Sequence, residues 1–184
     1  MKERVTIHIG GVYGSAKPAV IYTLLGSCVA VCLFEPLSAI GAMNHILLPG
    51  EATLKQLNAA TRFGINAMEL LINRMMQLGA DRRKFVAKIF GGAHVLPSIS
   101  PENGVGRKIF DFVAEFLENE RIPLISKDIG GRKGRKVWFH TDTGDVFVKT
   151  IEPTLLYAVQ SEEKRALPHV VRESKKPGQI TFFY

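Results

Sequence analysis

Short apolar segments separated by turn residues run along most of the chain, which predicts a protein rich in β-strands. Residues 5–9 alternate between apolar and polar positions, and glycines follow at once. Residues 28–34 and 41–48 are apolar almost without interruption, so both faces of these strands are expected to be buried. The segment between them contains Pro36 and is typical of a turn, which predicts a hairpin. The other predicted strands are residues 20–25, 85–90, 124–127, 137–140 and 146–151.

Two longer segments carry apolar residues three and four positions apart, which is the period of an amphipathic helix. They are residues 61–78, closed by Gly79, and residues 105–117. Thr53 and Gln56 have the spacing of a capping box, which would start the first helix earlier. Strands outnumber helices, so the expected fold class is mixed α/β, in the sense of α+β. We expect a layered sandwich in which a largely mixed β-sheet with hairpins is packed by at least two amphipathic helices.

The length of 184 residues suits one ordinary domain. The pattern changes after Ile151, where the charged runs 162–165 and 175–176 lie between short apolar pieces. We therefore predict a domain over residues 1–154 and a C-terminal extension over residues 155–184 that packs on or flanks this domain.

The composition is that of a folded globular protein, with 46% hydrophobic and 22% charged residues. A net charge of +7 favours an acidic partner, whether nucleic acid, anionic lipid or protein, without choosing among them. Residues 1–20 lack the unbroken apolar stretch of a secretory signal, and residues 19–34 fall short of the length that spans a bilayer. The sequence thus predicts a cytoplasmic protein without membrane insertion.

The predicted hairpin brings a cysteine and a histidine near each other, because opposed residues on antiparallel strands have indices with a constant sum. A two-residue turn at Pro36 gives a sum of 73 and places Cys28 opposite His45. A longer turn gives a sum of 75, so that His45 faces Ala30 and Cys28 becomes its diagonal neighbour. An imidazole beside a thiol favours the reactive thiolate, which is the nucleophile of cysteine enzymes. The plainer interpretation is a small buried cysteine and a core histidine with satisfied hydrogen bonds.

Gly26 and Ser27 interrupt the strand just before Cys28, so backbone N–H groups there could turn toward an oxyanion. Cys32 shares a strand face with Cys28, and we assign it a packing role. The histidines show no metal-ligand spacing, so no metal site is predicted.

Six blocks of the chain stand in an order that a known family shares. They are LLGSCVAVCL at 24–33, GAMNHILLP at 41–49, KIFGGA at 88–93, GRK at 106–108, DIGG at 128–131 and GRKV at 134–137. In these blocks the sequence resembles the chemoreceptor glutamine deamidases, the CheD family, over roughly residues 4–150. Several ordered blocks are far more specific than any single short motif.

The resemblance implies an enzyme of bacterial chemotaxis that converts glutamines of methyl-accepting chemotaxis receptors to glutamate through a thioester, without metal or organic cofactor. It makes Cys28 the nucleophile and His45 the general base, with Gly26 and Ser27 near the oxyanion. The family's third residue is a threonine that orients the histidine. In the form of the motif used for comparison it stands six residues before the cysteine, where this chain has Tyr22, and Thr23 is our candidate.

The resemblance also implies a CheC-type phosphatase as a partner and, in some members, hydrolysis of glutamyl methyl esters. The alternative function is a non-catalytic module that regulates receptors or such a phosphatase by binding. An RNA-binding function comes third, because the basic run 132–136 lacks interleaved aromatic residues and is interpreted as a solvated hairpin end. No nucleic-acid partner is therefore predicted, and no heptad pattern calls for an oligomer, so a monomer is expected.

Overall fold

The described residues of the computed structural model, 1–48, 50, 53–56, 58–94 and 104–176, form two β-sheets and three α-helices. The first sheet has the order β1-β3-β8-β9, with β1 at Glu3–Thr6, β3 at Ala19–Leu25, β8 at Arg135–His140 and β9 at Val146–Thr150. The second has the order β2-β5-β4-β6-β7, with β2 at Val12–Ser15, β5 at Ile40–Ile46, β4 at Val29–Glu35, β6 at Val86–Gly91 and β7 at Leu124–Ile129. The helices are α1 at Ala59–Gln77, α2 at Val105–Asn119 and α3 at Pro153–Ser174.

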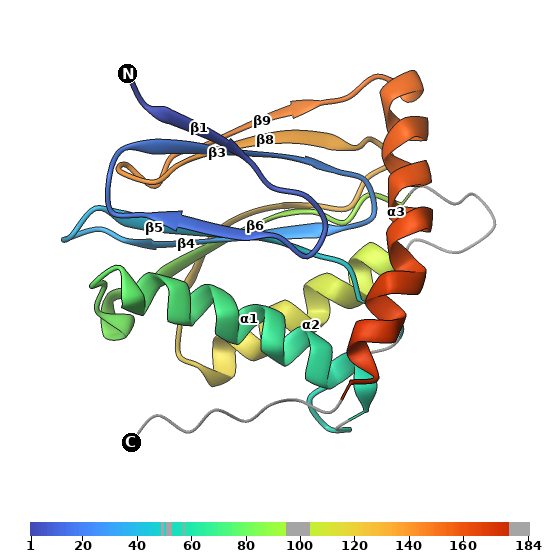
Figure 1. The fold of residues 1–184 in the computed structure, drawn as a ribbon, viewed down its shortest axis with the longest axis horizontal. Helices are drawn as coiled ribbons and strands as arrows, with labels where there is room; N and C mark the ends of the chain where they lie inside the picture. Colours follow the sequence, from blue (N-terminus) through green and yellow to red (C-terminus); the bar gives the residue numbers. More distant parts are fainter. Residues whose placement is uncertain (49, 51–52, 57, 95–103, 177–184) are drawn as a thin grey trace.

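The molecule is built in layers, with the two sheets stacked and α1 and α2 beneath the second sheet (Figure 1). Side chains of β4 alternate between the two interfaces, as expected for a strand buried on both faces. Val29, Val31 and Leu33 pack with the helices, whereas Ala30 and Cys32 pack in the layer between the sheets. The site described below lies in this inter-sheet layer.

The predicted fold class is confirmed, since both sheets are mixed and helices cover one of them. The strands divide between two sheets, however, where the sequence predicted one. The first strand is Glu3–Thr6 rather than residues 5–9, and β2 was not predicted.

The hairpin of β4 and β5 is confirmed, and of the two turns considered the longer one is present. Ala30 pairs with His45 and Glu35 pairs with Ile40, so the indices sum to 75 and the loop has four residues. A two-residue hairpin loop needs a positive φ at its first position, and proline fixes φ near −65°. Pro36 therefore excludes the short turn. The Glu35 carboxylate instead accepts hydrogen bonds from the loop N–H groups of Leu37 and Ser38.

The predicted capping box at Thr53 and Gln56 is also wrong. Helix α1 begins at Ala59, and the Asn58 side chain caps it by accepting from the backbone N–H of Thr61. Thr53 and Gln56 form an isolated β-bridge before the helix.

Residues 153–174 form α3, for which no helix was predicted. The helix stands across one end of both sheets (Figure 1). The predicted boundary between residues 154 and 155 falls inside it, and residues 177–184 of the predicted extension lie outside the described residues. Among the helices of the described ranges, none is both long and apolar enough to cross a bilayer.

Candidate active site

Thr23 and His45 meet in the layer between the sheets. The odd-numbered residues of β3 face inward, so the Thr23 side chain is fully buried. Its Oγ1 lies 2.8 Å from His45 Nδ1 and 2.9 Å from the carbonyl oxygen of Ile7. Tyr22 is on the other face of β3 and stacks on Trp138, with ring centroids 5.3 Å apart. Thr23, and not Tyr22, is therefore the neighbour of His45.

These contacts determine which nitrogen of His45 carries the proton. A carbonyl oxygen only accepts, so the Thr23 hydroxyl donates to Ile7, and Oγ1 accepts from His45 Nδ1–H. The lone pair is then on Nε2, which is buried and has no hydrogen-bond partner among the described residues. Burial, with a smaller contribution from His8, lowers the pKa of His45 to about 3. The ring is thus neutral, and Nε2 is free to accept a proton.

The backbone of His45 is held by the glycines that follow β1. The N–H of Gly10 donates to the His45 carbonyl, and the His45 N–H donates to the Gly11 carbonyl at 3.0 Å. Gly10 has φ +79°, a conformation that favours glycine. The turn between β1 and β2 therefore holds the backbone of β5 on the side away from β4, and in this way it positions the imidazole.

Cys28 lies just before β4, where the chain passes from the first sheet to the second. Because His45 is paired with Ala30, Cys28 is its diagonal neighbour on the same inward face. Diagonal neighbours stand about 7–8 Å apart, which is within the reach of long side chains. Cys28 is fully buried, and both it and Cys32 are free thiols.

Glu163 of α3 is the part of the site that sequence reasoning missed. One oxygen of its carboxylate accepts from the Cys28 N–H at 3.1 Å, and the other accepts from the Ser27 N–H at 3.3 Å and the Ser27 hydroxyl at 2.7 Å. Of the residues predicted to lie near an oxyanion, Ser27 thus directs its N–H at a carboxylate of the same chain, and so does the neighbouring Cys28. The sequence offers no clear signal for it, because Glu163 stands inside the charged run 162–165, and the structure alone places it with Val159 and Val170 on the buried face of α3.

The Cys28 thiol is protonated in this arrangement. Burial raises the pKa of Cys28 well above its usual value, and the negative charge of the Glu163 carboxylate raises it further. Burial likewise raises the pKa of Cys32. The arrangement therefore holds a neutral thiol near a neutral imidazole.

Two glycines of the second sheet support the Cys28 backbone. Gly92 N–H donates to the Cys28 carbonyl at 2.7 Å, and Ala93 N–H donates to the Gly26 carbonyl at 2.8 Å. Gly91 has φ +110°, and a Cβ there would stand only 2.4 Å from the Cys28 carbonyl oxygen. The close approach of these strands thus depends on glycine at position 91.

Arg135 ties this region to the first sheet. It forms a two-pronged ion pair with Asp128 and donates from Nη1 to the carbonyl of Gly130 at 2.9 Å. The hydrogen bonds from Arg135 lower the pKa of Asp128. The interpretation of residues 132–136 as a solvated run is therefore wrong for Arg135, which is buried because it links β8 to the end of β7.

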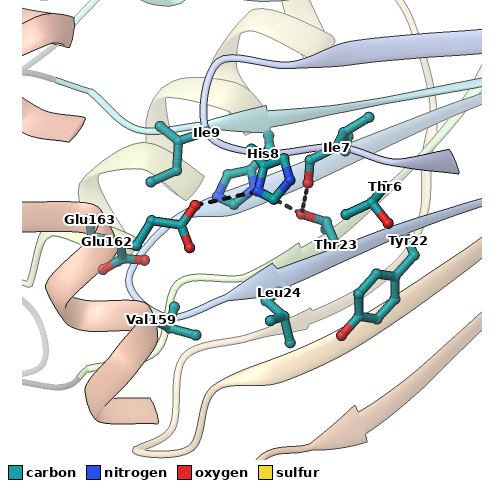
Figure 2. Close-up of a pocket in the computed structure, with 11 residues that line it drawn as sticks. Thr6, Ile7, His8, Ile9, Tyr22, Thr23, Leu24, Val159, Glu162 and Glu163 are labelled. Atoms are coloured by element: carbon teal, nitrogen blue, oxygen red, sulfur yellow. Dashed lines mark hydrogen bonds and ion pairs between the residues drawn. The ribbon is translucent and has the colours of Figure 1, made fainter. Parts of the chain in front are cut away.

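A cavity of about 50 Å³ adjoins the site, lined by Thr23, His45, Glu163 and Val159 among others. Figure 2 shows the hydrogen bond between Thr23 and Ile7. Val159 and Glu163 belong to α3 and form the part of the cavity wall that this helix provides. No group of three or more His, Cys, Asp or Glu side chains within the described ranges is arranged to hold a metal ion.

A family model described as "CheD chemotactic sensory transduction" matches residues 47–150, which is more than half of the chain. The chain belongs to the CheD family. A protein of Chromobacterium violaceum named "Probable chemoreceptor glutamine deamidase CheD 2" is 39% identical over 97% of this chain and 89% of its own length. Another of that name from Shewanella oneidensis is 43% identical over 88% of this chain and 84% of its own length.

A third CheD relative, from Xanthomonas axonopodis pv. citri, is named "Probable chemoreceptor glutamine deamidase CheD" and is 49% identical over 70% of this chain and 64% of its own length. The residues matched by the CheD model begin after Thr23, Cys28 and His45. The roles of these three side chains are therefore argued from their geometry.

Proposed function

We propose that this protein is a cysteine-dependent glutamine deamidase that acts on methyl-accepting chemotaxis receptors. The substrate follows from the names of the relatives, and the residues follow from the site. The observation that carries the proposal is the buried, unpartnered Nε2 of His45, whose lone pair is set by the hydrogen bonds of Thr23. In this proposal Cys28 is the nucleophile, His45 is the general base and acid, and Thr23 orients His45.

The reaction begins when His45 Nε2 takes the Cys28 thiol proton and the sulfur attacks the carboxamide carbon of a glutamine side chain. The oxyanion of the tetrahedral intermediate is held by the N–H groups of Ser27 and Cys28. His45 returns the proton to the departing nitrogen, so ammonia leaves and a thioester forms. Water then attacks the thioester while His45 takes its proton and passes it to the sulfur, which releases glutamate and the Cys28 thiol. The residues supply every proton transfer in this scheme.

Mass spectrometry of a receptor cytoplasmic fragment tests the proposal. Each deamidated glutamine gains about 1 Da, because an amide becomes an acid. We expect this gain with the intact protein and none with Cys28→Ala. Cys32→Ala is the matched control, since Cys32 is an equally buried thiol on the same strand face, and it should retain the activity.

A binding module without catalytic activity is the second candidate, and the observation that favours it is the complete burial of a protonated Cys28 beneath Glu163. Cells that lack the protein distinguish the two functions. If Cys28→Ala restores receptor signalling in such cells, the protein acts by binding, because an enzyme cannot dispense with its nucleophile.

The remaining expectations belong to the same proposal. We propose a cytoplasmic monomer that also binds a CheC-type phosphatase and hydrolyses glutamyl methyl esters as a side reaction. The ester reaction needs the same attack by Cys28, so Cys28→Ala would abolish it together with deamidation. The division into a domain of residues 1–154 and an extension of residues 155–184 likewise stays a prediction.

A further inference from the structure

Glu163 is a buried carboxylate without an ion pair among the described residues. It is 8% exposed, and no Lys, Arg or His of the described residues forms an ion pair with it. Burying an unpaired carboxylate is costly unless hydrogen bonds replace its hydration. The replacements here are the hydrogen bonds from the Ser27 N–H, the Ser27 hydroxyl and the Cys28 N–H. Three hydrogen-bond donors thus converge on this position of α3, and they favour a carboxylate there.

The position of this carboxylate resembles that of the reaction product, and this inference rests on the proposed function. The product of glutamine deamidation is a glutamate side chain, which before release has its oxygens at the oxyanion donors and its carboxyl carbon beside the sulfur. Glu163 is a glutamate whose oxygens bind those same N–H groups, and Cys28 is the residue that carries the sulfur. We propose that α3 is an autoinhibitory helix, which occupies the substrate site with Glu163 as a mimic of the product.

The packing of α3 excludes a substrate from this position. Cys28 has no exposed surface, and a Cβ at Gly26 would stand 2.9 Å from Glu163 Oε1, so the carboxylate fills the space beside the motif. The cavity of about 50 Å³ beside Glu163 has room for only a few water molecules. A larger cavity of about 330 Å³ also reaches His45, but neither Cys28 nor Glu163 lines it. A receptor glutamine can reach the thiol only after α3 has withdrawn Glu163.

The charge of Glu163 also suppresses the nucleophile. A nearby negative charge disfavours the thiolate, and Glu163 adds to the effect of burial on the pKa of Cys28. Withdrawal of α3 would therefore expose the thiol, empty the oxyanion donors and ease ionisation in a single movement.

The test compares Glu163→Ala and Glu163→Gln with the wild-type full-length chain. Glu173→Gln is the matched control, because Glu173 lies on the same helix and pairs with Lys176 at 2.7 Å, away from Cys28. Two rates are measured: alkylation of Cys28 by iodoacetamide, followed by peptide mass, and deamidation of a receptor cytoplasmic fragment. The alkylation rate requires no receptor, so it reports on the cover over Cys28 separately from the proposed function.

We expect Glu163→Ala to raise the alkylation rate by about tenfold or more, since both access and ionisation improve. The kcat/KM for deamidation should rise by a similar factor, because a competing closed state lowers apparent affinity by the fraction of competent molecules. Glu163→Gln keeps a hydrogen-bond acceptor and the side-chain shape without the charge, so its rates should lie between those of the wild type and Glu163→Ala. If thermal unfolding shows that Glu163→Ala is misfolded, the test is made with Glu163→Gln alone.

Unchanged rates in both Glu163 variants, with an active wild type, would overturn the inference and leave the proposed function standing. A fall in deamidation would also overturn it, because Glu163 would then assist the reaction. Faster alkylation of Cys28 with no deamidation by any variant would overturn the proposed function instead, and α3 would remain a cover over a reactive thiol.

Discussion

Replacing Thr23 with valine tests whether its hydroxyl determines the protonation and orientation of His45. Valine has nearly the same shape, and Thr23 is fully buried, so the substitution leaves no cavity and removes only the hydroxyl. Two buried groups then lose their partners, the Nδ1–H of His45 and the carbonyl of Ile7. Each buried group without a partner costs about 1–3 kcal/mol, so we expect the free energy of unfolding to fall by about 2–6 kcal/mol.

The substitution should also lower the rate of catalysis. Without an acceptor at Nδ1 the ring can turn or place its proton on Nε2, where it can no longer take the proton of Cys28. We expect kcat for deamidation to fall by roughly 100-fold, the usual size of a general base contribution. Thr23→Ser retains the hydroxyl and should retain most of the activity, although it leaves a small cavity.

Urea denaturation and the receptor-fragment mass assay measure the two effects on the same preparations. Thr23→Val with wild-type kcat would refute the role of the hydroxyl. An equally large loss of kcat in Thr23→Ser would also count against it, because that variant keeps the hydroxyl and the loss would then not follow the hydrogen bond.

Gly91→Ala should lower deamidation at least tenfold, since the added Cβ would stand 2.4 Å from the Cys28 carbonyl oxygen and shift the nucleophile; wild-type activity would contradict this account. Acid should destabilise the protein through His45, whose pKa falls to about 3 on folding from an ordinary value of 6.5. The unfolded chain binds this proton more tightly, so stability is lost as pH falls below about 6.5 and continues to fall down to about pH 3, with roughly 2–3 kcal/mol lost by pH 4.5. The urea midpoint of His45→Gln should fall less steeply with decreasing pH than that of the wild type. Equal pH dependence in the two proteins would exclude His45 as the cause of the acid instability. Arg135→Lys should lower the free energy of unfolding by about 2 kcal/mol in urea, because an ammonium cannot make the forked bond to Asp128; an unchanged midpoint would show that the fork is dispensable.

The hairpin shows which parts of this site can be predicted from sequence. Continuous apolar runs on either side of a turn revealed β4 and β5, because burial on both faces leaves a strong pattern. The register required the loop length, and the relevant signal was the chemistry of Pro36 rather than the strand pattern. An index sum of 73 places Cys28 opposite His45, whereas the observed sum of 75 places Ala30 there. Cys28 stays on the same strand face in either register.

Helix α3 shows what the pattern could not reveal. Its chain is charged and contains Pro168 inside the helix, where proline removes a backbone hydrogen bond and argues against helical structure. Tertiary packing overrides this preference, since Val170 joins the hydrophobic cluster between the sheets and Val159 is also buried. Glu163 looked like one member of a charged run, and only the fold shows that it points at Ser27 and Cys28.

The site depends on contacts between the layers more than on any single element. Thr23 comes from the first sheet, His45 comes from the second, and Cys28 lies on the connection between the sheets. A small slip of one sheet over the other would separate the hydroxyl from the imidazole without breaking a strand pair. Gly41 allows the two sheets to approach closely here, because a Cβ there would stand 2.8 Å from the Phe139 ring of the facing sheet. The close packing at this position, like that at Gly91, therefore serves the geometry of the site as well as the stability of the core.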